Sequence, residues 1–148
     1  MNQDALQRMI QYNPDIVTFR DPREGVPDTW IQKAEQAIGI ELSRSYKWWL
    51  KNYGSGRVGK EPIYSINDPE ADPTKSVDIL SMFHLYKLPN RRIPICHSDV
   101  EGVFSLAPDE VTAPGEYAVY SEALKGVYAL TFSDFLEKRI KAYLVHDR

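Results

Sequence analysis

The sequence contains a single cysteine, Cys96, and only three histidines among its 148 residues. One cysteine excludes an intramolecular disulfide and a thiolate metal cluster within the chain, so packing must supply the stability. The histidines, His84, His97 and His146, show no metal-binding spacing such as HExxH, and the chain has no CxxC or calcium-loop pattern. The sequence therefore predicts neither a metal site nor a cofactor.

Long hydrophobic runs are also missing. No stretch approaches the ~20 apolar residues that a membrane helix needs, and the first residues lack the basic and then apolar pattern of a signal peptide. The formal net charge is −3 and the pI is about 5.6. This balance argues against direct nucleic-acid binding, because phosphate contacts need a clustered basic surface. We expect a cytoplasmic protein without membrane contacts, whose mild acidity suits a basic partner.

What the sequence does contain is clear hydrophobic periodicity. Helical spacing of apolar residues predicts helices over 5–12, 28–38, 44–53, 77–88 and 132–144, and alternation predicts short strands at 62–66, 92–97, 102–106, 116–120 and 126–130. The last four strands are typical of an antiparallel meander. No repeat or composition shift marks a second domain. We predict one α+β domain, residues 1–148, with an antiparallel sheet of about five short strands packed against helices on one side.

Cys96 and its neighbour His97 are the only candidates for nucleophilic catalysis by a thiolate and a base. Successive residues of a strand point to opposite faces, so we expect a packed Cys96 and a surface His97. The acidic residues are scattered, and spacing singles out no pair for acid–base work. We therefore predict no catalytic residue and no enzyme. A small hydrolase that uses Cys96, His97 and nearby acids is the weaker alternative.

The segment Gly54–Lys60 contains three glycines and superficially resembles a phosphate-binding loop. Such a loop follows a strand, has GxxxxGK[ST] spacing and precedes a helix, whereas this segment follows a predicted helix. A helix C-cap followed by a flexible turn explains the same glycines.

Trp48 and Trp49 lie side by side on the helix predicted over 44–53. Trp49 belongs to the apolar stripe that faces the core, and Trp48 cannot share that face. Trp48 is therefore either at the edge of the core or an exposed aromatic that can anchor a partner.

Two segments, 26–42 and 45–56, carry a recognisable pattern: an I-x-x-A-E helix, then G-[IV]-x-L, then a Y-x-x-[FW]-[LM] helix that ends in a glycine-rich turn. The matching residues are Ile31, Ala34, Glu35, Gly39, Ile40, Leu42, Tyr46, Trp49, Leu50, Gly54 and Gly56. Later segments with similar patterns are 93–96, 102–106 and 131–136. Over residues 26–140 the chain resembles the SUKH superfamily, specifically its Smi/Knr-type domains. It departs from the family pattern at Ser43, where proline is usual, and at Ala107, where an acidic residue is common.

This resemblance implies a SUKH-like fold and a bacterial immunity protein that binds and neutralises a cognate toxin, often a nuclease, in the cytoplasm. Fungal relatives are regulatory binding proteins, so a regulatory or scaffold domain for an endogenous protein is the alternative. The matched positions are mostly packing and turn positions, and the partner surface would consist of variable loop and sheet positions. Exposed acids around an aromatic could meet a basic partner. The candidate partner-binding residues are Trp48, Glu70, Asp72, Asp99, Glu101, Asp109 and Glu110.

Overall fold

The computed structural model describes residues 2–19, 25–70 and 77–146. These residues form five α-helices, seven strands and the short 3₁₀ helix η2. In chain order the elements are α1 (Gln3–Tyr12), β1 (Val17–Phe19), α2 (Asp28–Ile38), α3 (Arg44–Asn52), β2 (Gly56–Val58), β3 (Glu61–Ile63), α4 (Ile79–Tyr86), η2 (Pro89–Arg91), β4 (Ile93–Ser98), β5 (Gly102–Ala113), β6 (Glu116–Ser121), β7 (Gly126–Ala129) and α5 (Phe132–His146).

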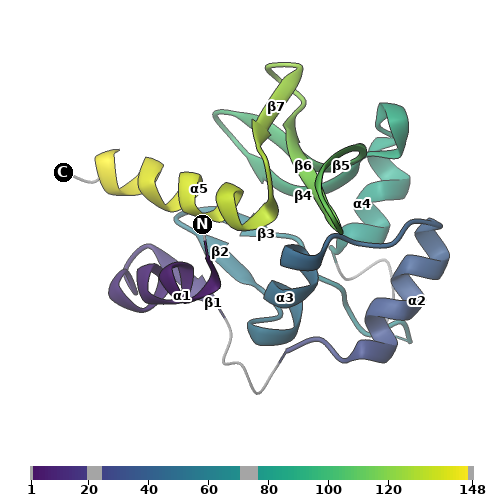
Figure 1. The fold of residues 1–148 in the computed structure, drawn as a ribbon, viewed down its shortest axis with the longest axis horizontal. Helices are drawn as coiled ribbons and strands as arrows, with labels where there is room; N and C mark the ends of the chain where they lie inside the picture. Colours follow the sequence, from purple (N-terminus) through teal and green to yellow (C-terminus); the bar gives the residue numbers. More distant parts are fainter. Residues whose placement is uncertain (1, 20–24, 71–76, 147–148) are drawn as a thin grey trace.

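The strands form one sheet in the order β1-β2-β3-β4-β5-β6-β7, and every neighbouring pair is antiparallel. The predicted α+β class and the meander are confirmed. The predicted number of about five strands was wrong, because β1 and β2 have three residues each and are too short to show an alternating pattern. In Figure 1, α1 and α5 lie on the left of the strands and α2 and α4 on the right.

The glycine-rich segment contains β2 and the turn of the β2–β3 hairpin, so the prediction of a flexible turn over the whole segment was wrong. Gly56 pairs with Phe19 of β1 and Ile63 of β3. Its φ of 143° favours glycine, and a Cβ at this position would overlap the backbone carbonyl oxygen of Thr18. Gly59 begins the turn to β3 with a φ of 58°. Glycine is therefore needed here for close backbone approach and for turn geometry.

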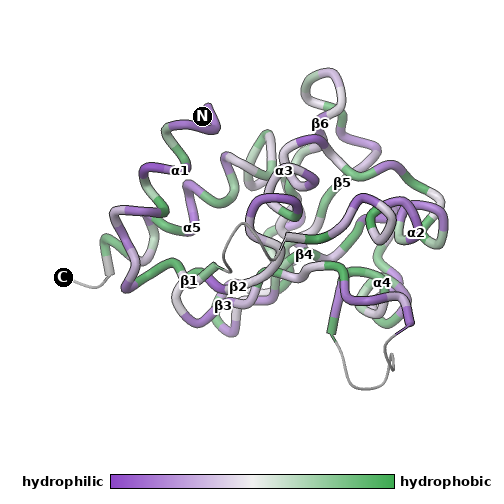
Figure 2. Tube along the Cα trace, turned by 90° about the horizontal axis from the view of Figure 1, so that it is seen from below, coloured by the Kyte–Doolittle hydropathy of each residue, from purple (hydrophilic) through white to green (hydrophobic). Residues whose placement is uncertain are grey.

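Aromatic side chains fill the centre of the core. Tyr46 and Trp49 of α3 are fully buried, and both rings pack against Phe132 of α5, with ring centroids 4.9 and 5.7 Å away. The Tyr46 hydroxyl donates to the backbone carbonyl of Tyr64, at 2.5 Å. Burying each such side chain stabilises the fold by about 1.5–3 kcal/mol. Figure 2 shows hydrophobic residues concentrated along β4 and β5, between the helices.

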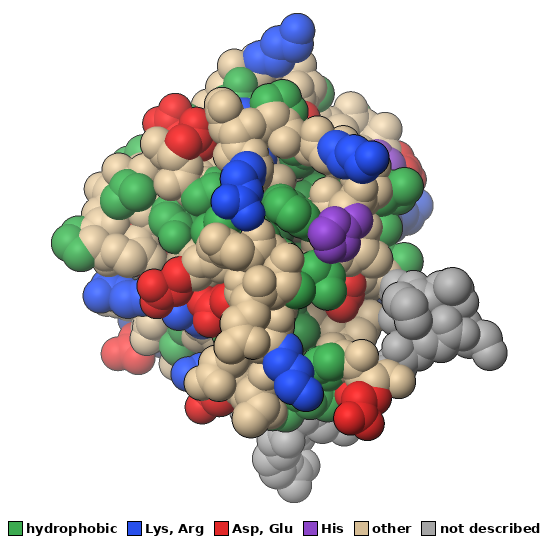
Figure 3. All heavy atoms as spheres, turned by 90° about the vertical axis from the view of Figure 1, so that its right-hand side faces the viewer, with side chains coloured by type: hydrophobic (Ala, Val, Ile, Leu, Met, Phe, Trp, Pro, Cys, Tyr) green, Lys and Arg blue, Asp and Glu red, His purple; other side chains and the backbone are tan. Residues whose placement is uncertain are grey.

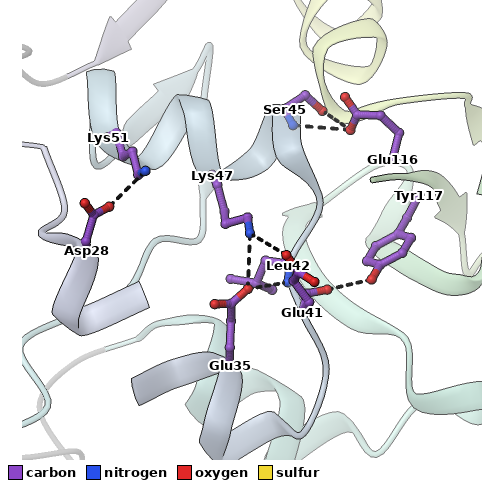
Figure 4. A network of polar contacts seen from close by, with 9 residues as sticks. All are labelled: Asp28, Glu35, Glu41, Leu42, Ser45, Lys47, Lys51, Glu116 and Tyr117. Atoms are coloured by element: carbon purple, nitrogen blue, oxygen red, sulfur yellow. Dashed lines mark hydrogen bonds and ion pairs between the residues drawn. The ribbon is translucent and has the colours of Figure 1, made fainter. Parts of the chain in front are cut away.

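A polar network joins α2, α3 and β6 (Figure 4). The Glu35 carboxylate accepts a hydrogen bond from the Leu42 backbone N–H at 2.8 Å and lies 3.4 Å from the Lys47 ammonium group. The Tyr117 hydroxyl donates to the Glu41 carbonyl at 2.6 Å. Glu35 thus satisfies a backbone donor in the tight connection between the two helices. This contact gives a physical reason for a glutamate at the end of the I-x-x-A-E pattern.

The first turn of α3 is capped by a residue distant in sequence. Ser43 occupies the N-cap position but makes no capping hydrogen bond, and its buried hydroxyl has no partner. The Glu116 carboxylate of β6 instead accepts from the backbone N–H and the hydroxyl of Ser45, at 3.2 and 2.8 Å. Serine is a common N-cap residue, but here the Ser43 side chain does not cap the helix, because a stronger, charged acceptor occupies its place.

This arrangement predicts opposite effects for two neighbouring serines. Ser43→Ala removes an unpaired buried hydroxyl, so we expect the free energy of unfolding to stay unchanged or to rise by about 1 kcal/mol. Ser45→Ala takes a hydrogen bond from a buried carboxylate and should lower it by about 1–3 kcal/mol. Urea unfolding followed by tryptophan fluorescence measures both. A larger loss for Ser43→Ala than for Ser45→Ala would contradict the assignment of Glu116 as the cap.

Candidate partner-binding site

The structure places most of the predicted partner-binding residues on separate surfaces. Asp72 lies outside the described residues. Glu70 is exposed in the loop after β3. Asp109 and Glu110 are exposed in a bulge of β5, where the pairing register moves from Ala107 opposite Ala118 to Val111 opposite Tyr117. Trp48 is half-buried and packs edge-to-face on Tyr53, with ring centroids 5.9 Å apart. Of the two alternatives for Trp48, the edge of the core describes it better.

Asp99 and Glu101 lie together in the β4–β5 turn. Asp109 and Glu110 follow on the same strand, eight or more residues further along β5. At ~3.3 Å per strand residue this separates the two acidic pairs by about 25 Å. The fold therefore does not bring all the predicted acids into a single patch.

Two adjoining hollows lie beside the β4–β5 turn, between β3 and α5, with volumes of about 550 and 390 Å³. Both are lined by Glu61, Ser98, Val100 and Tyr143. The larger is also lined by Lys60, Pro62, Tyr64, His97 and Asp99, and the smaller by Glu101, Arg139 and Ala142. We call these two hollows together the Arg139 cleft. Its size falls in the range of ~300–1,000 Å³ that is typical of binding pockets.

Arg139 of α5 organises one wall of the cleft. Its side chain is only 4% exposed, and its Nη2 donates to both carboxylate oxygens of Glu61, at 2.9 and 2.6 Å. Its Nη1 forms an ion pair with Glu101 and a 3.2 Å hydrogen bond to the Tyr128 hydroxyl. Burial alone would lower the pKa of Arg139, but its hydrogen bonds to Glu61 and Tyr128 outweigh this and raise it. The guanidinium therefore stays charged and joins β3, the β4–β5 turn and α5.

Sequence reasoning missed Arg139 and Glu61 as site residues. In the sequence Arg139 follows Lys138, and such a short basic pair is typical of a soluble surface or a helix C-terminus. The available signal was its spacing, since Phe132, Phe135, Arg139 and Tyr143 follow the i, i+3, i+7, i+11 pattern of one helix face. An arginine within an apolar stripe needs a buried partner.

The side chain of Val100 projects into solvent from the β4–β5 turn. Val100 is 94% exposed, although the turn around it is fixed on both sides. The Glu101 backbone N–H donates to the Ser98 hydroxyl at 3.1 Å, and the Glu101 side chain is held by Arg139. Gly102 supplies the positive φ of 82° that ends the turn. A rigid turn that presents an apolar side chain is a feature of preformed binding surfaces.

Two tyrosines line the cleft. Burial and a hydrogen bond to Glu61 raise the pKa of Tyr143, and burial together with the nearby Tyr86 raises the pKa of Tyr64 to about 12. Both rings are therefore neutral phenols at physiological pH. The Tyr143 ring also lies directly over Gly59, where a Cβ would overlap it. These contacts fix the position of both aromatic walls.

Cys96 and His97 diverge as the sequence predicted. Cys96 is fully buried and His97 is exposed. Burial raises the pKa of the Cys96 thiol to about 12. This geometry gives no support to the alternative of a hydrolase that uses a Cys96 thiolate and a His97 base.

We expect native Cys96 to resist alkylation by iodoacetamide at pH 8 and to react readily in urea. Its pKa in the folded state is raised above the unfolded value of about 8.5. The protonated, buried thiol therefore makes its full contribution to the free energy of unfolding below pH ~8.5. That contribution is lost as the pH rises towards 12. Mass spectrometry of the intact protein measures the modification. Rapid stoichiometric labelling of the folded protein at pH 8 would contradict this prediction.

Another exposed surface lies over α4, where Leu85 and Tyr86 are accessible to solvent. Figure 3 shows the side of the molecule on which α2 and α4 lie. Hydrophobic side chains are mixed there with Lys, Arg, Asp, Glu and His. Neither positive nor negative charge predominates on this side, in contrast to the Arg139 cleft. Among the described residues, no group of three or more His, Cys, Asp or Glu is arranged to hold a metal ion.

A comparison with protein-family models returns SUKH_5, described as SMI1-KNR4 cell-wall, over residues 4–141. The match extends from α1 into α5 and includes both the α2–α3 motif and most of the residues that line the Arg139 cleft. A comparison with curated proteins finds no match.

Proposed function

Because this chain belongs to the SMI1-KNR4 family, as the SUKH_5 match over nearly its whole length shows, we propose that it is an immunity protein that binds and neutralises a cognate toxin. The family suggests a protein-binding role. The toxin is a basic protein such as a nuclease, and the chain inhibits it by forming a complex rather than by catalysis. Neutralisation takes place in the cytoplasm. None of the described helices combines the length and the apolar character needed to cross a bilayer.

The observation that carries this proposal is the fixed β4–β5 turn. It presents Val100 to solvent beside the carboxylates of Asp99 and Glu101. Interfaces commonly combine apolar anchors with charges that attract and orient the partner. A surface that is already rigid in the free protein loses little entropy on binding. The mild net negative charge of the chain also favours a basic partner.

The test is co-expression with the toxin encoded beside this gene. The native chain should restore growth and form a complex that survives size-exclusion chromatography. Val100→Lys should weaken protection, because it places a like charge where a basic partner binds. Val111→Lys is the matched control, since Val111 is another exposed valine but lies in the β5 bulge. Failure of the native chain both to restore growth and to form a complex would refute the proposed function.

A further inference from the structure

The Arg139 cleft has an excess of negative charge. Three carboxylates line it, from Glu61, Asp99 and Glu101, against two cationic side chains, Lys60 and Arg139. The Arg139 charge is already matched by Glu61, which it contacts through both carboxylate oxygens. Glu101 also pairs with Arg139, but its side chain is 46% exposed, and Asp99 is exposed with no ion pair among the described residues. Two carboxylates at the mouth of the cleft are therefore accessible to an incoming cation.

The walls of the cleft suit the apolar stem and the charged head of a long side chain. The rings of Tyr64 and Tyr143 line the larger hollow together with Pro62. Aromatic rings attract cations that lie over their faces, and they pack against methylene groups. The Tyr143 ring packs closely over Gly59, and Tyr64 lies near Tyr86. The aromatic walls therefore need no rearrangement before an occupant enters.

We propose that the Arg139 cleft receives one arginine or lysine side chain of the protein partner, while Val100 packs against apolar surface beside it. The charged head lies against Asp99 and Glu101, and the stem lies between the tyrosine rings. This proposal rests on the proposed function, because it takes the occupant to be a protein. It adds four residues that acidic-loop reasoning did not include: Glu61, Tyr64, Val100 and Tyr143.

The experiment uses the full chain and a small probe, acetyl-arginine-methylamide, with the uncharged acetyl-citrulline-methylamide as its control. The probe should shift the NMR signals of the Val100 and Ala142 methyl groups in a saturable way. Its dissociation constant should be on the order of 1–10 mM, as expected for a ligand of this size. The citrulline compound should produce no comparable shifts, because it has the same shape without the charge.

Two double variants separate the cleft from general surface charge. Asp99→Asn with Glu101→Gln should weaken binding of the arginine probe by about fivefold. Asp109→Asn with Glu110→Gln removes the same charge from the β5 bulge and should leave binding unchanged. Urea unfolding of each variant checks that Arg139 still holds the fold. Equal binding of both probes, no methyl shift up to about 50 mM, or equal effects of the two double variants would overturn the proposal.

The result of the probe-binding experiment is independent of the result of the growth experiment. If the chain protects against the toxin but does not bind the arginine probe, the immunity function stands and the cleft proposal fails. If the cleft binds the probe but the chain forms no complex with the toxin, the cleft proposal stands for another basic partner and the immunity function fails.

Discussion

Arg139→Met is expected to lower the free energy of unfolding by about 3–5 kcal/mol. The substitution leaves the Glu61 carboxylate, which is 5% exposed, without its cationic partner in the interior. It also removes the hydrogen bond to Tyr128 and the stacking of the guanidinium over Phe104, whose ring centroid is 5.2 Å away. For a chain of this length the melting temperature should fall by roughly 10 °C. Urea and thermal unfolding both measure the change.

A double variant shows whether the loss comes from the stranded carboxylate. Glu61→Met combined with Arg139→Met replaces the buried ion pair by side chains of similar volume, and it should recover most of the stability. Glu101 needs no replacement, because its exposed carboxylate can be hydrated. If the double variant is as unstable as Arg139→Met alone, or if Arg139→Met costs less than about 1 kcal/mol, the buried pair is not the cause.

Gly56→Ala should destabilise the protein by about 3 kcal/mol or more. The new methyl group would overlap the Thr18 carbonyl and approach the Cα atom and ring of Phe19, and a φ of 143° disfavours any side chain. The conflict is with backbone, so it can be relieved only if β1 moves away from β2. Phe19 packs edge-to-face on Trp49, with ring centroids 5.5 Å apart, so this movement also disturbs the core. Urea unfolding measures the loss, and hydrogen exchange should show reduced protection of the β1 amides.

Gly126→Ala is the matched control. Gly126 also lies in a strand, but no atom lies within 4 Å of the position that its Cβ would occupy. The alanine should change the stability by less than about 1 kcal/mol, and it can stabilise by restricting the unfolded chain. Equal effects at the two glycines would show that the close approach of β1 to β2 is not what requires Gly56.

Local patterns in the sequence were sufficient to predict most of the helices and strands. The helix predicted over 28–38 is α2 (Asp28–Ile38), and Gly39, a residue type typical of helix C-caps, ends it with a φ of 81°. The Thr131 hydroxyl accepts from the Asp134 backbone N–H at 3.1 Å, and the Thr-x-x-Asp pattern is a local sequence signal for such a helix start. Helix caps and apolar stripes involve residues within about one turn of each other, so they are visible in a short window.

The missed features depend on residues that are far apart in the chain. Glu116 and Ser45 are separated by 71 positions, and Arg139 and Glu61 by 78. No short window contains both members of either pair, and the residue types alone do not indicate the pairing. Asp99 and Glu101 were predicted as acids of an exposed turn. The cleft beside them could not be predicted, because it is formed where β3 and α5 meet that turn.

The sequential order of the sheet has a consequence for folding kinetics. Every strand pairs with its neighbour along the chain. The β2–β3 pair and the pairs from β4 to β7 can form as local hairpins, whereas the β1–β2 pair closes a long loop through α2 and α3, and the β3–β4 pair closes one through α4. The Arg139–Glu61 contact, in contrast, can form only after α5 reaches β3. We therefore expect the ion pair to be absent from the folding transition state, so that its removal accelerates unfolding and leaves the folding rate nearly unchanged. The buried arginine would then determine how long the native protein persists rather than how quickly it forms.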